Sequence, residues 1–516
     1  ESGGETGVDL GAESVSTWWW WLGVVSSLLV SLAVMVFRHS LVQVLKDIMV
    51  LWRVSRLFPA HPPTHWLLGH VDLFSGKQYA ALQQCADGCG PVGIVRLLWT
   101  PFVVVNDPDL CRQVLMNKNL TKSNRIWGHF FPYLQNSILL IKDHAEWATT
   151  RRLVNPLFAS DEKMSLLFEA MCSGIREFFD RAAQQSASKN EIMLLKDLNE
   201  MTFEVIMRTS VGLYTKLGAS KTNHTVDSLL QKFIARAREP INWYKVLETP
   251  EKKVFDHMVA DVHNTFESII AKRRKETPQE ARERNSTDLL DLLLQAENDP
   301  SMDGVQMPND WLRDNLAVFI TAGQDTTASA LAWAIMNFIR NPSILQKARQ
   351  EVDSVLEDAG REEATFEDLK RMTFLNGFMM ENLRLFPPAV SFNRETVHEE
   401  EILGKTVPPG TIILINVWAV NRNRAYWGDD AEEFRPERWL QMDAEERRRK
   451  SLLTFSAGPR SCIGARFSQI EQMIFLAKLL HEFDFECTNT TEPVPLDSFT
   501  LKAEPPVRIR LYKRVR

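Results

Sequence analysis

The amino-acid sequence predicts a mainly α-helical protein with small β-sheets, preceded by an N-terminal transmembrane helix. Apolar residues recur at spacings of three and four through most of the chain, which is typical of helices. Short β-branched runs bounded by turn residues interrupt this pattern and predict the sheets. An uncharged apolar run at residues 18–37 is long enough to cross a bilayer. With 516 residues and 45% hydrophobic content, the chain can bury a large core.

The apolar run at residues 18–37, WWWWLGVVSSLLVSLAVMVF, is the first element. Its four tryptophans suit an interfacial belt at one end of a membrane helix. The charges before it are all acidic, whereas Arg38, Lys46, Arg53 and Arg56 follow it, so the positive-inside rule places the rest of the chain in the cytosol. A signal peptide would have a basic start and a shorter apolar core, and a transit peptide would be rich in arginine, so we favour an anchor.

A proline-rich stretch, Phe58–His70, separates this anchor from the remainder of the chain, because Pro59, Pro62 and Pro63 forbid a continuous helix. Beyond it, the sequence has no low-complexity linker and no internal repeat, which favours one large domain. The basic run Lys272–Lys275 and the polar residues after it are typical of an exposed loop between helices. We therefore expect a leader at 1–17, the anchor at 18–37, a basic and proline-rich linker at 38–70, and a large folded domain at 71–516.

The composition excludes two classes of protein. With 60 basic and 66 acidic residues, the formal net charge is −6, which gives no electrostatic footprint for nucleic acid. Six scattered cysteines are too few for a disulfide scaffold and favour a reducing compartment. The pair Cys85 and Cys89 lacks the second pair of ligands that a structural zinc site requires.

Two β-branched runs predict strands in the folded domain. The first is Gly93–Val105, and the second is Thr411–Val417, which follows a Pro-Pro-Gly turn. Between them, a long helix is predicted over Asp310–Arg340, because a proline two residues later stops it. At the rise of an α-helix, this element would run roughly 45 Å and cross the domain.

The segment AGQDTT lies in the middle of this predicted helix. Ala322 and Gly323 remove side-chain bulk, and the Thr326 hydroxyl can compete for a backbone carbonyl four residues earlier, which loosens the helix. A small ligand could then meet the backbone beside Asp325 and Thr326, an acid and an alcohol that can relay protons. The same residues also suit the close packing of a buried helix, and the segment alone favours that simpler interpretation.

In ENLR, Glu381 and Arg384 are three residues apart and share a helix face. Such a pair is usually a surface salt bridge of little worth. Here the apolar neighbours, including Leu383 and Phe386, indicate burial, and a buried charge pair needs further partners. Arg438, in FRPERW, is a candidate for that partner.

Two further segments could bind an anion. In WATTR, the indole of Trp147 and the guanidinium of Arg151 are four residues apart, so both donors point the same way and suit a carboxylate or a phosphate. Arg394, in FNRET, is a similar cation. A solvated helix face is the alternative interpretation of WATTR.

The turn FSAGPRSCIG, Phe455–Gly464, holds a single cysteine. Gly458 and Gly464 allow backbone conformations and close approaches that a Cβ atom would block. The apolar run after Cys462 predicts a helix that starts at or just beyond it, so the thiol, close to Arg460 and to backbone amides, should ionise readily. A thiolate is a nucleophile or a metal ligand, and no histidine base can be assigned to it, which favours the ligand.

Together these segments resemble the cytochrome P-450 superfamily, the haem-thiolate monooxygenases. Four segments match family motifs, and they follow one another along the chain in the family's order: WATTR matches the WxxxR helix, AGQDTT the oxygen-binding helix, ENLR the ExxR pair and PER the PER element. The five motifs cover Trp147–Gly464. The highly specific family motif FxxGxRxCxG is matched at all its fixed positions: Phe455, Gly458, Arg460, Cys462 and Gly464.

The resemblance implies a role for each matched residue. Cys462 would be the axial thiolate of haem b, and Asp325 with Thr326 would support proton delivery to bound oxygen. Ala322 stands where some fatty-acid hydroxylases of this family carry a glutamate bonded to haem, so the haem is expected to be non-covalent. The residues that would brace the cysteine turn are Glu381, Arg384 and Arg438. The residues expected to bind haem, the first four of them at its propionates, are Trp147, Arg151, Arg394, Arg460, Phe455 and Gly464.

The resemblance also implies the reaction and its partners. Anchored members of the family insert one oxygen atom from O2 into lipophilic substrates, with electrons from NADPH through a membrane-bound NADPH-cytochrome reductase or, additionally, a cytochrome b-type donor. The basic run Arg447–Lys450, with Arg466, would dock the acidic reductase, unless it is only a solvated charge run. The expected location is the endoplasmic reticulum membrane, with a single span and a cytosolic catalytic domain at 71–516.

The substrate is predicted less closely than the reaction. AGQDTTASALAW and WGDDAEEFRPERW look like families that hydroxylate fatty acids near the chain end, and sterol, terpenoid and xenobiotic oxidation stay open. Two other functions compete: an oxygen-independent isomerase or dehydratase of lipid hydroperoxides, which tends to lose the acid-alcohol pair, and a non-catalytic haem carrier. An apolar pocket is predicted from Trp127, Phe130, Phe131, Tyr133, Ile138, Ala389, Val390 and Phe392.

Overall fold

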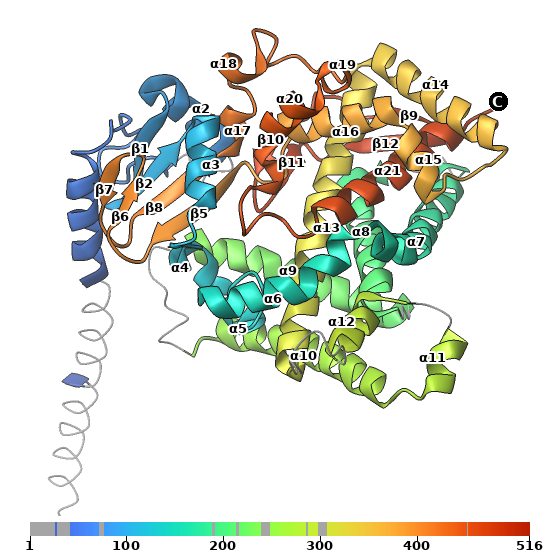
Figure 1. Ribbon diagram of the computed structural model, residues 1–516, viewed down its shortest axis with the longest axis horizontal. Helices are drawn as coiled ribbons and strands as arrows, with labels where there is room; N and C mark the ends of the chain where they lie inside the picture. Colours follow the sequence, from blue (N-terminus) through green and yellow to red (C-terminus); the bar gives the residue numbers. More distant parts are fainter. Residues whose placement is uncertain are drawn as a thin grey trace, which may run out of the picture.

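Helices form most of the molecule, and the largest sheet lies at one side of them (Figure 1). The computed structural model describes residues 26–27, 42–71, 77–187, 191–212, 216–238, 248–284, 287–297, 307–450 and 452–515. The helices are α2 (Gln78–Cys89), α3 (Pro108–Met116), α4 (Asn124–Trp127), η2 (Gly128–Phe130), α5 (Phe131–Leu134), α6 (His144–Ala159), α7 (Asp161–Ala187), α8 (Leu194–Val211), α9 (Lys216–Arg238), α10 (Pro250–Lys275), α11 (Pro278–Arg284), α12 (Leu289–Glu297), α13 (Asn309–Arg340), α14 (Pro342–Ala359), α15 (Phe366–Arg371), α16 (Thr373–Leu385), α17 (Val417–Val420), α18 (Arg424–Trp427), α19 (Glu437–Gln441), α20 (Ala444–Arg449), η5 (Leu453–Phe455) and α21 (Ala465–Glu482). The strands are β1 (Val92–Leu97), β2 (Thr100–Val105), β3 (Leu120–Thr121), β4 (Ile192–Met193), β5 (Ser391–Thr396), β6 (Glu400–Ile402), β7 (Lys405–Val407), β8 (Ile412–Asn416), β9 (Phe483–Cys487), β10 (Val494–Asp497), β11 (Leu501–Glu504) and β12 (Arg508–Lys513).

The largest sheet has the strand order β1-β2-β8-β5-β3. β1 and β2 form an antiparallel hairpin within the first β-branched run, and β8 arises from the second, so both strand predictions are confirmed. β8 joins β2 in parallel and β5 in antiparallel orientation. The short β3 completes the sheet, with Leu120 opposite Thr396 and Thr121 opposite Glu395 of β5.

The helix α13 confirms the predicted long element and passes through the middle of the molecule (Figure 1). Most of its side chains from Leu312 to Phe338 are buried, as is typical of a helix in the core of a large domain. It ends at Asn341, whose backbone is no longer helical because Pro342 follows it. α13 packs against α8, α10, α16 and α21.

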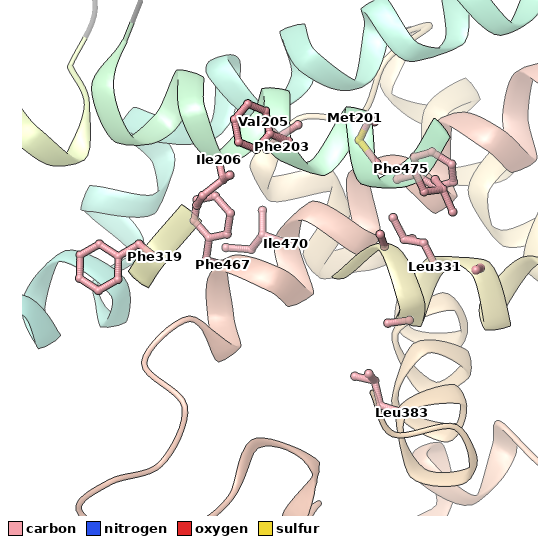
Figure 2. Packing of buried hydrophobic residues seen from close by; sticks show 14 of the residues in the cluster. Met201, Phe203, Val205, Ile206, Phe319, Leu331, Leu383, Phe467, Ile470 and Phe475 are labelled. Carbon is pink, nitrogen blue, oxygen red and sulfur yellow. The ribbon is translucent and has the colours of Figure 1, made fainter. Parts of the chain in front are cut away.

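Aromatic and branched side chains fill the core beside α13. Figure 2 shows Phe467 and Ile470 of α21 lying close to Ile206 of α8. The Phe158 ring of α6 meets the Phe319 ring of α13 at 5.2 Å and the Phe467 ring at 6.4 Å, both edge-on. This packing fixes the start of α21 relative to α13.

The predicted anchor and leader lie outside the described residues, apart from Ser26 and Ser27. No helix among the described residues is long and apolar enough to cross a membrane.

A helix over residues 42–54 lies within the segment predicted as a linker. Its Val50 and Val54 are buried in the apolar cluster beneath the large sheet. Asp47 of the same helix is bound by Arg125, which follows β3 in the chain. Arg53 of this helix also pairs with Glu399 at 2.5 Å, so the helix is attached to the folded body through one apolar face and two ion pairs.

The prediction of an exposed loop at Lys272–Lys275 is wrong. These residues form the last turn of α10, where positive charge suits a helix C-terminus. Arg273 is buried, and its Nη1 donates to Asp288 at 2.8 and 2.9 Å and to Asp291 at 2.5 Å. The two carboxylates lie fifteen or more residues further along the chain, so a local charge pattern could not indicate that one arginine turns inward.

Candidate functional site

A single cysteine lies in the turn between η5 and α21. The Cys462 amide donates to the carbonyl of Phe455 at 2.8 Å, which closes the turn. Gly458 has φ +72°, and a Cβ atom there would lie 2.4 Å from the carbonyl oxygen of Leu115, so the predicted need for glycine is confirmed. α21 begins at Ala465, just beyond the cysteine, as predicted.

Gly464 differs from Gly458. Its φ of −83° is open to any residue, and nothing lies within 4 Å of an added Cβ atom. No contact within the described protein therefore requires a glycine at this position. The space beside it, two residues from Cys462, can admit a bound group that approaches the backbone closely.

Cys462 lies deep in the molecule and yet has exposed surface. Burial among protein atoms raises its pKa, although the Gly464 amide and the charges of Arg151 and Lys122 lower it. The residues on either side are half-buried, whereas Cys462 itself is exposed. A thiol that is both surrounded and accessible opens onto internal space. Because burial outweighs the amides and cations, the expectation that this thiol ionises readily is wrong for the protein alone.

A second exposed strip lies on α13. Ala322 is exposed and Thr326 is half-buried, although Thr321 and Thr327 beside them are buried. The Thr326 hydroxyl donates to the Ala322 carbonyl at 2.8 Å, as predicted. Thr327 is hydrogen-bonded to Ser468, in the first turn of α21, at 2.9 Å. The AGQDTT segment is therefore held beside the helix that starts at the cysteine turn.

Asp325 is bound on another side of α13. Its side chain is buried, its Oδ2 accepts a hydrogen bond from the Thr500 hydroxyl at 2.7 Å, and its Oδ1 lies 3.6 Å from Lys502 Nζ. Within the described part of the chain, no hydrogen bond joins Asp325 to Thr326. The acid and the alcohol are adjacent in sequence, but each is engaged with a different partner.

Two arginines near the cysteine turn lack carboxylate partners among the described residues. Burial lowers the pKa of Arg394 to about 10, and its buried Nη2 has no hydrogen-bond partner in that part of the chain. Burial and the charge of Arg394 lower the pKa of Arg460 to about 10. The Arg460 guanidinium lies 4.5 Å above the Trp147 ring, so this indole serves as a platform for the arginine.

Arg151 is bound to the turn itself. Its Nη1 donates to the carbonyl of Ser461 at 2.8 Å, and burial lowers its pKa. Both donors of WATTR thus reach the turn from one helix: the Arg151 side chain binds the Ser461 carbonyl, and the Trp147 ring contacts the Arg460 guanidinium. Phe455 is half-buried at the start of the turn and packs against the main core.

Lys122 is a site residue that the sequence pattern does not reveal. Burial first, and then the charges of Arg394 and Arg460, lower its pKa to about 7. Its position follows from the sheet, because Lys122 comes directly after β3, and β3 pairs with β5, which carries Arg394. A single lysine in LTKSN gives no local signal, since its neighbours at the site come from distant segments.

The Glu381 carboxylate is fully buried and accepts five hydrogen bonds from described groups. Arg384 donates at 2.8 and 2.9 Å, the Arg435 amide at 2.9 Å, Arg438 at 3.1 Å and the Trp439 indole at 2.9 Å. Arg438 therefore supplies the third charge that the sequence suggests. The same region reaches the cysteine turn, because Thr454 of η5 donates to the Leu383 carbonyl of α16 at 2.8 Å.

The residues predicted to line an apolar pocket are partly brought together. Phe130 and Tyr133 are buried, and the Phe130 ring stacks on Phe233 of α9 with centroids 3.9 Å apart. Phe499, between β10 and β11, lies 6.1 Å from the same ring. Phe131, by contrast, is exposed. The sequence does not indicate the contribution of α9 or of the C-terminal hairpin.

The cations and the accessible cysteine suit an anionic ligand that carries a metal. The described residues contain no group of three or more His, Cys, Asp or Glu side chains that could hold a metal ion. A metal bound by Cys462 would therefore take its remaining ligands from a group that is not protein. The cations Arg394, Arg460 and Lys122 would meet the negative charges of that group.

Comparison with known proteins shows a match along most of the chain. A family profile described as Cytochrome P450 matches residues 59–511. The chain is 30% identical over 433 residues to the 11-oxo-beta-amyrin 30-oxidase of Medicago truncatula, covering 81% of this chain and 80% of that protein. It is 30% identical over 419 residues to Cytochrome P450 CYP72A613 of Trigonella foenum-graecum, with 77% of each chain covered. It is 24% identical over 459 residues to the human ultra-long-chain fatty acid omega-hydroxylase, with 85% of each covered.

Proposed function

Because this chain belongs to the cytochrome P450 family, and is therefore a haem-dependent monooxygenase that uses electrons from NADPH, we propose that it oxidises a membrane lipid, in the first place a fatty acid. The observation that carries the site assignment is the exposed thiol of Cys462 deep inside the protein, beside the AGQDTT strip of α13. The same geometry supports assigning Cys462 as the thiolate ligand of the haem iron.

The residues around the turn fit a haem. We propose that Arg394, with its unpartnered Nη2, Arg460 and Lys122 bind the propionates, which would restore the full charge of these desolvated cations. Gly464 would leave room for the ring beside the backbone. The exposed methyl of Ala322 offers no carboxylate for a covalent link, so the haem is non-covalent.

When bound through a thiolate, haem iron activates O2 for insertion of one oxygen atom into a C–H bond. The chain's own residues have three tasks around it. Arg151 holds the turn through the Ser461 carbonyl, Thr326 presents a hydroxyl at the exposed strip, and Asp325 supplies protons from the far side of α13. The relay is proposed from these positions together with the family motif.

Replacing Asp325 by asparagine should lower product formation on the order of 10²-fold, because an amide cannot release a proton. NADPH consumption should continue and yield hydrogen peroxide in place of product. The measurement is the ratio of product to NADPH consumed by the purified enzyme with its reductase. Asp310→Asn, an exposed acid in the first turn of the same helix, is the control. An unchanged ratio in Asp325→Asn would remove Asp325 from the proposed relay.

Replacing Lys122 by methionine should weaken haem binding about tenfold or more, since a hydrogen bond to a charged group is worth about 1.5–3 kcal/mol. The measurement is the rate of haem transfer from the purified protein to an acceptor apoprotein. Lys118→Met, which removes an exposed lysine four residues earlier, should transfer haem as the wild type does. Equal transfer rates for both variants would show that Lys122 does not contact the haem.

We propose a membrane-bound reductase as the electron donor, docked beside the cysteine turn. The basic run contributes Arg447, whose guanidinium donates to the Trp439 carbonyl at 2.9 Å and keeps its charge available. Lys450 and Arg466 are paired with Glu446 and Asp161, which reduces their part in such a surface. Among the described side chains, the docking proposal therefore rests mainly on Arg447.

We propose that the protein is attached to the endoplasmic reticulum membrane through the apolar run at 18–37 and that the helix over 42–54 lies against the lipid. This helix exposes Leu45, Met49 and Trp52 on the face opposite its buried one. The Trp66 side chain is 78% exposed nearby in sequence. Large apolar side chains rimmed by lysine and arginine suit an anionic membrane surface.

The substrate proposal is tested by supplying a mixture of fatty acids of several chain lengths and triterpenoids to the enzyme with reductase and NADPH. Mass spectrometry should detect fatty acids that have gained one oxygen atom. The terpenoid alternative is favoured by the 30% identity to the beta-amyrin oxidase, and products from triterpenoids alone would select it. Conversion of lipid hydroperoxides without NADPH would instead select the isomerase.

A further inference from the structure

A stripe of polar groups on α13 is bound to the C-terminal hairpin. Asp325, Ser329 and Trp333 are four residues apart and therefore lie on one helix face. Ser329 Oγ and Trp333 Nε1 both donate to the Leu501 carbonyl, at 2.7 and 2.9 Å. With the Thr500 bond to Asp325, these contacts fix the β10–β11 hairpin on α13.

Lys502, the next residue of this hairpin, connects the buried Asp325 with solvent. The Asp325 side chain is 4% exposed, whereas that of Lys502 is 20% exposed. Lys502 Nζ lies 3.6 Å from Asp325 Oδ1, and this oxygen is buried without a hydrogen-bond partner among the described residues. An ammonium group has three donors that rotate freely, so a small movement of Lys502 brings one of them to this oxygen.

Asp227 of α9 interacts electrostatically with the same lysine. Burial raises the pKa of the Asp227 carboxyl. The charge of Lys502 opposes this shift and the charge of Asp325 adds to it, so both groups act on Asp227. α9 is held on α13 one turn earlier, where Gln324 Nε2 donates to Asn223 Oδ1 at 2.8 Å. Asp227 is half-buried. Lys502 therefore interacts with two carboxylates, the buried one of Asp325 and the half-buried one of Asp227.

We propose that Asp227, Lys502 and Asp325 form the route by which protons enter from solvent to α13. The proposal rests on the proposed role of Asp325 in proton delivery. The Lys502 ammonium gives one proton to the Asp325 carboxylate, which leaves a neutral amine and a carboxylic acid. Asp325 then releases this proton toward Thr326 on the exposed strip, the amine regains a proton from the Asp227 carboxylic acid, and the Asp227 carboxylate takes up a proton from hydronium in the solvent. After these steps one proton has moved from solvent to α13, and all three side chains have returned to their starting protonation states.

Two substitutions of Lys502 separate a proton carrier from a fixed charge. Lys502→Met removes the charge, whereas Lys502→Arg keeps it on a guanidinium that cannot be deprotonated in a protein. With dodecanoic acid as the probe substrate, product per NADPH should fall about tenfold in both variants, and the solvent isotope effect on product formation should increase. Recovery of the wild-type ratio by Lys502→Arg would overturn the proposal, because a fixed charge would then suffice.

Hydrogen exchange over residues 494–504, followed by mass spectrometry, tests the structural alternative. Exchange should stay at the wild-type level in Lys502→Arg. If exchange increases in both variants to the same degree as the ratio of product to NADPH falls, a loosened hairpin explains the loss and the proposal is overturned. Lys478→Met is the matched control, since Lys478 is a part-buried lysine paired with Glu363 and Glu482 at 2.9 and 2.5 Å. It should keep the wild-type ratio of product to NADPH.

Failure of this route and failure of the proposed function give different results. If the ratio of product to NADPH falls in Asp325→Asn but stays at the wild-type value in Lys502→Met, the proposed route through Lys502 is wrong and the role of Asp325 stands. If Asp325→Asn itself matches the wild type, the relay is wrong whatever Lys502 does. Asp227→Asn should lower the ratio in the same direction as Lys502→Met, and an unchanged ratio there would remove Asp227 from the route.

Discussion

Replacing Cys462 by alanine is expected to abolish the red-shifted Soret band that the reduced protein gives with carbon monoxide. This band reports thiolate ligation of haem iron, and Cys462 is the thiol that opens onto internal space next to the AGQDTT strip. Monooxygenation should fall to the background level in the same variant, because the ligand that donates electron density is lost. The measurement is the difference spectrum of purified protein, normalised to its haem content.

Cys487→Ala provides the matched control for this substitution. Cys487 is a half-buried thiol on β9, outside the site, and its removal should leave the spectrum unchanged. A normal red-shifted band in Cys462→Ala would show that another group ligates the iron. In that case the assignment of the cysteine turn would be wrong, although membership of the family would stand.

Replacing Glu381 by alanine is expected to cost about 3–5 kcal/mol of unfolding free energy, because it leaves the buried charge of Arg384 unpaired and leaves Arg438 with Asp430 alone. A typical domain has only about 5–15 kcal/mol in total, so little folded protein should be recovered at 37 °C. The expected readouts are a lower midpoint of denaturant unfolding and a loss of bound haem. Glu381→Gln keeps the shape but not the charge and should be intermediate.

Glu437→Ala is the control for this prediction. Glu437 belongs to the same FRPERW segment, but its partner Lys347, at 2.6 Å, is exposed. Removal of an exposed pair should cost at most about 1 kcal/mol. Equal losses of stability in Glu437→Ala and Glu381→Ala would contradict the idea that burial makes the Glu381 pair decisive.

The sequence predicted features that depend on local patterns. α13 was recognisable because its apolar residues continue for nine turns without a break and proline stops it. Burial of Glu381 and Arg384 followed from their apolar neighbours. Because a buried charge pair needs further partners, the sequence also indicated Arg438. The turn at Cys462 was defined by glycine and proline at fixed spacing, and the structure gives Gly458 the conformation that only glycine adopts easily.

Other parts of the site could not be predicted, because they depend on distant pairing. Lys122 reaches the cations only through the register of β3 with β5, nearly three hundred residues later. Lys502 reaches Asp325 only because the C-terminal hairpin folds back on α13. The protonation of Cys462 was predicted incorrectly for a related reason, since the protein around the thiol is assembled from remote segments and its desolvation outweighs the nearby helix terminus.

The set of hydrogen bonds on Glu381 also limits how this enzyme can evolve. Since one carboxylate satisfies two arginines, a backbone amide and an indole, the effect of changing any one of them depends strongly on the others. A substitution of one of these residues can be harmless after its partners have changed and yet destabilise the protein when it occurs first. Sequence changes at these positions are therefore expected to occur together rather than one at a time.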